Sequence, residues 1–387
     1  MSAPTIFAVL VDALRHDFPT ASAMPWTASL AADGVRTTVE ETFGFIGVRA
    51  AAFYGLHPAD AGYVFLYEVD RGRGDYRFLR PFPDRLMDRY PGIAWRGVKW
   101  HTAAVRRRDP EYPGPWDLSR VPPTVLKHLR VAERTVPWSP AYLPGQRSVF
   151  DAVGGDFLYL GYPKPLGRTD ELVAAFHREY AGQRLVWMHF SEPDWREHEH
   201  GASSPEVQAC LAEVDAAMKE VHGRLERDGP VRTVIFGDHG CLDVDASVDV
   251  MAALPPRAAA GLHFVDSTML RIWSDDAGLL RESAAALEAA APGGRVVGRE
   301  ELEGPYRCAW NRATFGDLLF VAAPGQVFVP NFFQGPDTAP AGMHGYLPDV
   351  PDNQAALVAH GPGIPELDDI EPMTAVHDIL SGFLGTP

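Results

Sequence analysis

The stretch VRTVIFGDHG, residues 231–240, combines an apolar run with a sharp polar ending. Its first six residues are mostly β-branched or aromatic, which predicts a buried strand. Gly237 and Gly240 let the backbone turn tightly around Asp238 and His239. Ligands of open α/β sheets bind beyond the carboxyl ends of the strands. The stretch therefore predicts either a metal-binding pair, for which zinc is well suited, or a polar turn.

Two further apolar runs end in side chains of the same kind. Residues 6–11 are predicted to form a buried parallel strand ending at Asp12, which is either a helix cap or a second metal carboxylate. Residues 185–190 are predicted to form another buried strand, followed by SEPDWREHEHG. In that segment Asp194 and His198 are spaced i, i+4, so a helical turn would direct both side chains the same way. A solvated acidic loop is the alternative.

A third histidine of this kind, His344, lies in GMHGYLPD, where glycines allow its ring to approach a ligand. Nitrogen and carboxylate oxygen ligands suit Zn²⁺, with Mn²⁺ as the second choice. Two such ions about 4 Å apart can hold the attacking and leaving oxygens of a phosphoryl or sulfuryl transfer. We therefore expect two divalent metal ions bound by three carboxylates and three imidazoles: Asp12, Asp194, His198, Asp238, His239 and His344.

The composition is that of an acidic globular protein. The chain has 387 residues, of which 46% are hydrophobic, and this allows one large domain with insertions or two domains. The formal net charge of −16 disfavours non-specific binding of nucleic acid. Bound metals can nevertheless create a local positive charge for an anionic substrate.

The cysteines and the N-terminus bear on the cellular location. Cys210, Cys241 and Cys308 fit no zinc-finger spacing and indicate no disulfide scaffold, which fits a reducing cytoplasm. The N-terminal segment lacks a basic leader and is predicted to be a first strand instead of a signal peptide. No apolar run approaches the roughly 20 residues of a membrane span. The sequence predicts a cytoplasmic protein with no membrane partner.

Helix and strand patterns alternate along the chain. Residues 205–227 repeat apolar side chains at helical spacing, and helices are also expected near 24–35, 49–54, 172–180 and 373–383. This alternation predicts an α/β fold with a mostly parallel central sheet flanked by helices on both faces. Residues 262–335 are expected to form a small α+β subdomain.

Residues 64–150 are rich in Pro, Arg, Trp and Tyr, and they are predicted to be a loop-rich insertion. The insertion contains a basic run. We interpret this run either as solvated surface or as a wall of the substrate site; it comprises Lys99, His101, Arg106, Arg107 and Arg108.

Taken in order, six motifs resemble those of the alkaline phosphatase superfamily: VDALR, MPWTASLAADG, RAAAFYGLHP, EPDWREH, GDHG and GMHGY. That superfamily includes nucleotide pyrophosphatase/phosphodiesterases, sulfatases and cofactor-independent phosphoglycerate mutases. EPDWREH is most similar to the phosphodiesterase branch, whereas RAAAFYGLHP resembles the sulfatase helix that follows the nucleophile. The resemblance implies one alkaline phosphatase-like domain over residues 1–387. It also implies that Asp194, His198 and His344 hold one metal, and that the other is held by Asp12, Asp238 and His239.

The resemblance further implies a Thr, Ser or modified Cys nucleophile ten residues before the glycine that matches Gly55. Phe45 occupies that position, and its neighbours Gly44 and Ile46 cannot replace it. Three alternatives remain open. Thr42 supplies the hydroxyl, a water activated by the metals attacks directly, or the site has lost covalent catalysis and carries out different chemistry or none.

Arg49 matches an arginine that lies near the nucleophile in sulfatases. It is expected either to contact an anionic group bidentately or to form an ion pair with Glu40 or Glu41. We predict a metal-dependent hydrolase of phosphate esters, with a phosphodiester or nucleotide-like substrate as first choice. A metal-dependent transferase or mutase of small-molecule metabolism and a non-catalytic, metal-stabilised binding protein are the alternatives. The expected partner is a small anionic substrate, without a nucleic-acid polymer, and a homodimer is left open.

Overall fold

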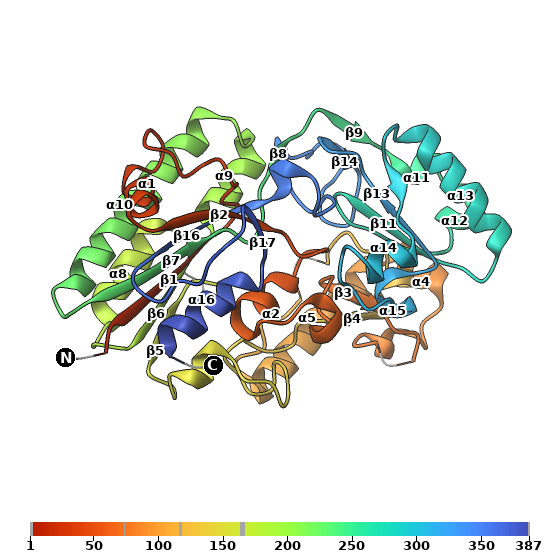
Figure 1. Ribbon diagram of the computed structural model, residues 1–387. Coiled ribbons are helices and arrows are strands. Elements are labelled where there is room, and N and C mark those ends of the chain that lie inside the picture. The colour runs from red at the N-terminus through yellow and green to blue at the C-terminus, as the bar shows by residue number, and fades with distance from the viewer. Residues whose placement is uncertain (1–2, 73, 116–117, 163–166, 386–387) are drawn as a thin grey trace.

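The structure is a computed structural model that describes residues 3–385 apart from residues 73, 116–117 and 163–166. Its larger lobe is built on a seven-stranded sheet in the order β17-β2-β16-β7-β1-β6-β5 (Figure 1). β16 runs antiparallel to both of its neighbours, whereas the other adjacent strands are parallel. The prediction of a mostly parallel central sheet is therefore confirmed. The strands are β1 (Thr5–Val11), β2 (Val35–Glu40), β5 (Phe157–Leu160), β6 (Leu185–Phe190), β7 (Val231–Phe236), β16 (Ala355–His360) and β17 (Ile370–Pro372).

Helices cover both faces of this sheet because successive side chains of each strand point to opposite sides. In β1 the odd-numbered residues from Phe7 to Val11 pack in one core with α1 (Pro25–Asp33), α8 (Thr169–Glu179) and α10 (Pro205–Glu226). The even-numbered residues from Ile6 to Leu10 pack in another core with α2 (Gly47–Tyr54), α7 (Val149–Ala152) and α16 (Ala375–Leu384). The predicted helices on both faces are confirmed.

The smaller lobe contains a four-stranded antiparallel sheet in the order β10-β11-β13-β12 (Figure 1). Its strands are β10 (Leu262–Val265), β11 (Met269–Trp273), β12 (Arg295–Val296) and β13 (Leu318–Val321). Nearby helices are α11 (Val250–Ala253), α12 (Pro256–Ala259), α13 (Ala277–Ala290), α14 (Arg299–Glu303) and α15 (Arg312–Phe315). This is the expected small α+β subdomain, while its limits at residues 262 and 335 remain a prediction.

Residues 64–150 are more regular than a loop-rich insertion. They include the antiparallel strand pair β3 (Tyr67–Val69) and β4 (Leu129–Val131), and they share a hydrophobic core with the four-stranded sheet. The 18-residue helix α5 (Pro91–Arg108) corrects the expectation of loops over its length. Ala94 and Val98 are its buried residues, so exposed apolar residues on its other side obscure the helical pattern. The remaining elements here are η1 (Arg77–Leu79), α4 (Asp84–Arg89) and α6 (Pro123–Leu126).

Several short elements complete the fold. α3 (Pro58–Ala61) follows α2, α9 (Glu192–His200) follows β6, and η2 (Pro351–Asn353) precedes β16. β8 (Leu242–Asp243) pairs with β15 (Gly342–Met343), and β9 (Ala246–Val248) pairs with β14 (Gln326–Phe328). Among the residues described, no helix is both long enough and apolar enough to cross a membrane.

Candidate metal centre

Three neighbouring strands carry predicted ligands to one edge of the central sheet. β1 lies between β6 and β7 and is parallel to both, so their carboxyl ends are adjacent. Asp12 follows β1 directly, and Asp238 and His239 follow β7. α9 begins two residues after β6 and places Asp194 and His198 one helical turn apart. The sheet topology therefore brings together residues that are more than two hundred positions apart in sequence.

The β8–β15 pair brings the last predicted ligand back to the same place. Met343 pairs with Leu242, which lies just beyond the loop after β7, and His344 follows Met343. The rings of His344 and His239 stack with their centroids 3.7 Å apart and their planes at 8°. His344, from the C-terminal part of the chain, is thus in contact with the residues that follow β7.

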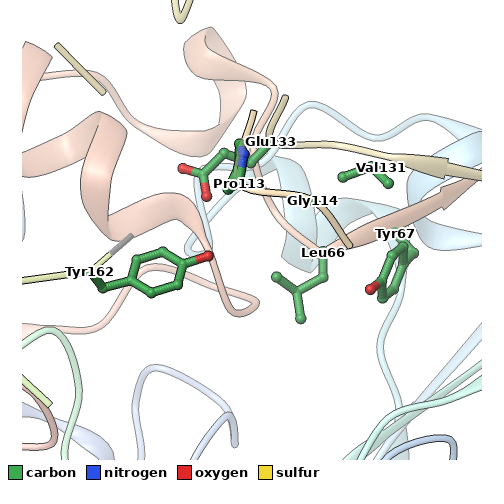
Figure 2. Close-up of a pocket in the computed structure, with 7 residues that line it drawn as sticks. All are labelled: Leu66, Tyr67, Pro113, Gly114, Val131, Glu133 and Tyr162. Atoms are coloured by element: carbon green, nitrogen blue, oxygen red, sulfur yellow. The ribbon is translucent and has the colours of Figure 1, made fainter. Parts of the chain in front are cut away.

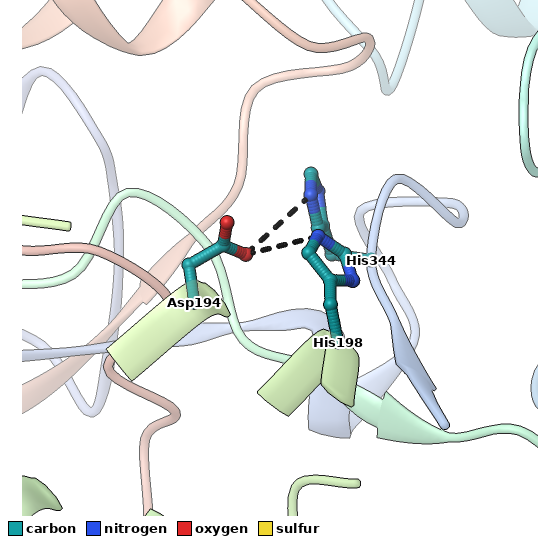
Figure 3. A group of neighbouring side chains, drawn as sticks. All are labelled: Asp194, His198 and His344. Atoms are coloured by element: carbon teal, nitrogen blue, oxygen red, sulfur yellow. Dashed lines mark ion pairs between the residues drawn. The ribbon is translucent and has the colours of Figure 1, made fainter. Parts of the chain in front are cut away.

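Asp194, His198 and His344 form one group of potential ligands (Figure 3). Asp194 Oδ1 lies 3.3 Å from His198 Nε2 and 3.8 Å from His344 Nε2. His198 Nδ1 is 2.8 Å from the carbonyl oxygen of Gly342, which can only accept a hydrogen bond. Nδ1 therefore carries the proton, and the lone pair of Nε2 faces the group, as a metal ligand requires.

Asp12, Asp238 and His239 form the second group. His239 Nε2 lies 3.4 Å from Asp12 Oδ1 and 3.7 Å from Asp238 Oδ1. His239 Nδ1 lies 2.9 Å from the carbonyl oxygen of Gly240, so this ring also directs its Nε2 toward the carboxylates. The backbone N–H groups of Ala13 and His239 donate to Asp238 Oδ1 and fix that carboxylate.

Sequence reasoning missed a further histidine beside this second group. His189 is 4% exposed, and its Nε2 lies 3.1 Å from Asp12 Oδ2, the oxygen turned away from His239. His189 is an interior residue of the apolar run LVWMHF, which favours interpretation as core. One feature of the sequence could have identified His189. It lies one residue before the end of a predicted strand, and that strand is followed by predicted metal ligands.

The electrostatics of the two groups favour a bound cation. Burial raises the pKa of Asp194, and burial together with Asp12 raises the pKa of Asp238 to about 6. Burial raises the pKa of Asp12 as well, but hydrogen bonds with His189 and His239 outweigh it and hold the pKa well below its ordinary value. Burial lowers the pKa of His344, aided by His239 and His198, which keeps this imidazole neutral.

The donor set fits divalent metal ions. Asp194 Oδ1 is buried, yet it accepts no hydrogen bond from any residue that the structure describes. Each group offers oxygen and nitrogen donors within 4.8 Å of one another. Such a mixed set suits Zn²⁺ and, less selectively, Mn²⁺. Burial without hydrogen bonding is costly for a carboxylate, and a cation would relieve that cost.

Phe45 lies beside one of the two groups of potential ligands, as its place in the motif suggests. Its ring meets the ring of His344 edge to face, with centroids 6.0 Å apart. Gly345 has φ +78°, and a Cβ built there would lie 2.2 Å from Phe45 Cε1. The absence of a side chain at Gly345 is what allows Phe45 to approach this loop.

Thr42 lies in the same loop, three residues before Phe45. Its Oγ1 is buried without a hydrogen-bond partner among the described residues, and a Cβ built on Gly47 would lie 2.6 Å from it. Thr42 also lines a small pocket with His57, Tyr306 and Arg307. In the described part of the chain, the hydroxyl of Thr42 forms no hydrogen bond with a residue of either ligand group. Its role as a nucleophile therefore remains a proposal.

Arg49 forms an ion pair with Glu133, which corrects the expectation of Glu40 or Glu41. The partner comes from the insertion because α2 packs beside this segment, whereas Glu41 instead accepts a hydrogen bond from Asn353. Glu133 also accepts a hydrogen bond from the hydroxyl of Tyr142 at 2.8 Å. The guanidinium of Arg49 packs over the ring of Tyr162 at 4.5 Å.

A small pocket borders this ion pair (Figure 2). Tyr162 connects it to the metal centre, since the ring of Tyr162 lies 6.4 Å from the ring of His189. The pocket is mostly apolar with one carboxylate, and it is lined by Leu66, Tyr67, Pro113, Gly114, Val131, Glu133 and Tyr162.

Comparisons with known proteins agree with this fold. The sequence model of the type I phosphodiesterase / nucleotide pyrophosphatase family matches residues 92–347. Human ectonucleotide pyrophosphatase / phosphodiesterase 5 is similar in structure over 99% of this chain and 95% of that chain, with 14% sequence identity and a TM-score of 0.68. The murine protein is similar over the same shares of the two chains, with 15% identity and a TM-score of 0.69.

An inactive variant of the murine protein in complex with AMP gives 15% identity and a TM-score of 0.69 over 99% of this chain and 96% of that chain. At these identities the likeness shows the shared fold. No curated protein sequence matches the chain.

Proposed function

The chain belongs to the type I phosphodiesterase / nucleotide pyrophosphatase family of hydrolases, and we propose that it cleaves a small phosphodiester or nucleotide-like substrate at a two-metal centre. One observation carries this proposal. Six side chains from four separate parts of the chain fall into two groups of three, and the stacked rings of His239 and His344 join the groups. Two adjacent sites of this kind suit the paired oxygens of a phosphoryl transfer.

We assign each group one divalent ion, with zinc as the first choice and manganese as the second. When bound, two such ions lower the pKa of water and offset the charge that develops on the transferred phosphoryl group. The protein's part is to hold the donors in place. The carbonyl oxygens of Gly240 and Gly342 hold Nδ1 of His239 and His198, so in both rings Nε2 is the atom that would face a metal.

Direct attack by water is the pathway that the residues around Phe45 support best. A phenyl ring has no nucleophilic atom, and this one occupies the position beside His344 where the family places its hydroxyl. Thr42 remains the alternative source of a hydroxyl, which would require the loop to turn. Arg49 is held by Glu133 and Tyr162, and its remaining N–H groups are proposed to contact the anionic group of the substrate.

The first experiment is hydrolysis of bis-p-nitrophenyl phosphate by the purified protein, together with elemental analysis. We expect about two zinc or manganese ions per chain and turnover that is lost on chelation and restored by the metal. Asp238→Ala should abolish turnover and reduce the metal content, whereas Asp33→Ala, an exposed aspartate on α1, should change neither. Two bound metals without turnover of any phosphate or sulfate ester would instead favour a transferase, a mutase or a binding protein.

Two variants separate the nucleophiles. If water attacks directly, Thr42→Ala retains turnover and the wild-type Phe45 enzyme needs no added hydroxyl. If Thr42 is the nucleophile, Thr42→Ala is inactive and Thr42→Ser retains activity. Phe45→Thr places a hydroxyl beside His344. A burst of product in the first turnover of this variant would indicate a covalent intermediate.

We also propose that the protein is cytoplasmic, and we leave open whether it forms a homodimer. The three cysteines are free and buried, which supports a reducing compartment. Cell fractionation and light scattering of the purified protein test the two proposals independently of activity.

A further inference from the structure

The insertion carries an exposed apolar surface that is separate from both ligand groups and from the pocket beside Arg49. Eight large hydrophobic side chains are exposed in the described chain, and six of them lie between residues 78 and 100. Trp100 is the most exposed, at 73%. Such clustering is unusual, since exposed apolar side chains are normally scattered singly. The six are Phe78, Phe82, Leu86, Tyr90, Ile93 and Trp100.

On α5 these apolar side chains share one face with arginines. Ile93, Arg96, Trp100 and Arg107 recur at intervals of three, four and seven residues, which places them along one side of a helix. All four are exposed, whereas Ala94 and Val98 on the other side pack into the core. The outward side is therefore an aromatic and aliphatic stripe interspersed with cations.

α4 continues the same surface. It ends at Arg89, and Tyr90 is the single residue between α4 and α5. The guanidinium of Arg89 lies over the ring of Tyr90 at 5.8 Å, so a cation and an aromatic ring are again side by side. We define the α4–α5 surface as the following exposed basic and large apolar residues of these two helices and of Tyr90 between them: Arg85, Leu86, Arg89, Tyr90, Ile93, Arg96, Lys99, Trp100 and Arg107.

The charge of this segment is opposite to that of the whole protein. Residues 77–108 contain nine Lys and Arg against two Asp, while the complete chain has a net charge of −16. A strongly basic segment on an acidic protein is a local feature that attracts an anionic partner. Solvation alone accounts for the cations, but it does not account for the apolar side chains exposed between them.

We propose that the α4–α5 surface docks on the surface of an anionic lipid bilayer. Trp and Tyr favour the headgroup region of a bilayer, where the ring is partly buried and the polar atom stays hydrated. Ile and Leu insert just below that level, and Lys and Arg bind lipid phosphates while their stems lie along the apolar side chains. Binding of this kind involves no span, and it departs from the expectation that the protein has no membrane partner.

Two other occupants fit the surface less well. A symmetric pair of copies would bring like surfaces together, because a twofold interface uses the same patch on both chains, and would oppose basic residues to basic residues. Nucleic acid would use the cations and Trp100, but exposed Ile93 and Leu86 have no role in stacking on bases. A lipid surface uses both kinds of side chain at once.

Flotation of the full chain with vesicles tests the proposal. We expect binding to phosphatidylcholine vesicles that contain phosphatidylglycerol, little binding to phosphatidylcholine alone, and weaker binding as salt is added. Arg96→Gln together with Arg107→Gln should reduce binding about 25-fold, since each cation near the bilayer contributes about fivefold. Ile93→Ala should reduce it roughly tenfold through lost apolar burial.

Matched controls use the same substitutions elsewhere. Ile370→Ala removes an isoleucine of similar exposure, 55% against 51%, and Arg281→Gln removes an exposed arginine of α13; both should leave vesicle binding unchanged. Bis-p-nitrophenyl phosphate turnover in solution should be the same for all these variants, which separates this inference from the assignment of the metal centre.

Three results would overturn the proposal. The first is equal binding to neutral and anionic vesicles, or none to either. The second is a dimer in solution that Ile93→Ala dissociates, which would assign the surface to a second copy. The third is preferential binding of an oligonucleotide in competition with anionic vesicles.

Discussion

Each lobe buries carboxylates, and the two lobes differ in the cation that compensates this buried negative charge. In the smaller lobe Arg271 is fully buried and contacts Asp266 at 3.2 Å. Its guanidinium also donates to the carbonyl oxygens of Tyr67 and Thr314 and lies 4.0 Å from the ring of Phe65. The chain itself supplies the cation there, and the cation joins the four-stranded sheet to the insertion.

In the larger lobe the buried anions of the ligand groups have no such cation. Within the part of the chain that the structure describes, the ion pairs of these carboxylates are with histidines and with no lysine or arginine. Burial lowers the pKa of His239, but Asp238 and Asp12 outweigh it and raise the pKa well above its ordinary value, so this imidazole carries a proton that a bound metal would replace. Three buried carboxylates whose ion pairs in the described chain are with titratable imidazoles are suited to an external cation, which would replace the imidazole proton; these carboxylates are Asp12, Asp194 and Asp238.

The largest expected effect comes from removing the cation that the chain supplies. Arg271→Met should reduce the free energy of unfolding by about 3–5 kcal/mol, because it leaves Asp266 buried and unpaired. Urea denaturation measures the loss. The double variant Arg271→Met/Asp266→Asn should recover part of it, since the uncompensated carboxylate is gone. A loss below about 1 kcal/mol for the single variant would show that the ion pair does not stabilise this lobe.

The next largest effect is expected from removing the proposed bound metal ions. Chelation should lower the free energy of unfolding by about 2.7–4 kcal/mol when the metal had been present at 100 to 1,000 times its dissociation constant. Thermal unfolding with and without chelator measures this shift. Arg271→Met protein should lose a similar amount on chelation, because distant sites contribute independently. An unchanged melting temperature in the wild type would contradict the metal assignment.

The sequence predicted the fold because its signals are local. Strand β6 has the predicted limits, Leu185–Phe190, since a continuous apolar run bounded by polar residues leaves little ambiguity. Asp238 and His239 were found for the same reason: the polar ending follows a strand directly. His344 is more than a hundred residues away, and it was predicted to join them because the ordered motifs resemble those of the superfamily.

Other features depend on packing that no short window contains. Glu133 is 84 residues from Arg49, so its choice as partner over Glu40 or Glu41 follows from the tertiary arrangement. His189 looks like core within an apolar strand, and its role depends on the neighbouring strand that presents Asp12. α5 was missed because its apolar residues occupy both sides of the helix, and a helical period is visible only when one side is polar.

His189 offers a smaller test of how the ligand groups are supported. Its hydrogen bond holds Asp12 Oδ2 and leaves Oδ1 turned toward His239. His189→Ala should weaken the binding of one of the two metals by about 10–100-fold, the usual effect of removing a residue that orients a ligand. Competition with a chromogenic chelator measures both dissociation constants.

The controls distinguish orientation from a general loss of stability. His189→Gln keeps an N–H donor and should recover part of the affinity. His263→Ala changes a histidine of similar burial, 5% against 4%, in the smaller lobe and should leave both metal dissociation constants unchanged. Equal weakening of both metals by His189→Ala would indicate a disturbed sheet instead of a misplaced Asp12.

The smallest expected effect is a change in proton release when metal binds. In the metal-free protein, burial and Asp12 raise the pKa of Asp238 to about 6, so below that pH a metal must displace a proton from this carboxyl. The folded, metal-free state therefore holds this proton at any pH below about 6, and metal affinity depends on the group throughout that range.

We therefore expect metal affinity at the Asp12, Asp238 and His239 site to fall more steeply below about pH 6, by one further factor of ten per pH unit. Isothermal titration calorimetry in buffers of different ionisation enthalpy counts the protons released. Asp238→Asn binds metal more weakly but should lose this additional proton, whereas His189→Gln should keep it. An affinity whose slope is the same on both sides of pH 6 would mean that Asp238 is already ionised without metal, and that hydrogen bonds from Ala13 and His239 outweigh its burial.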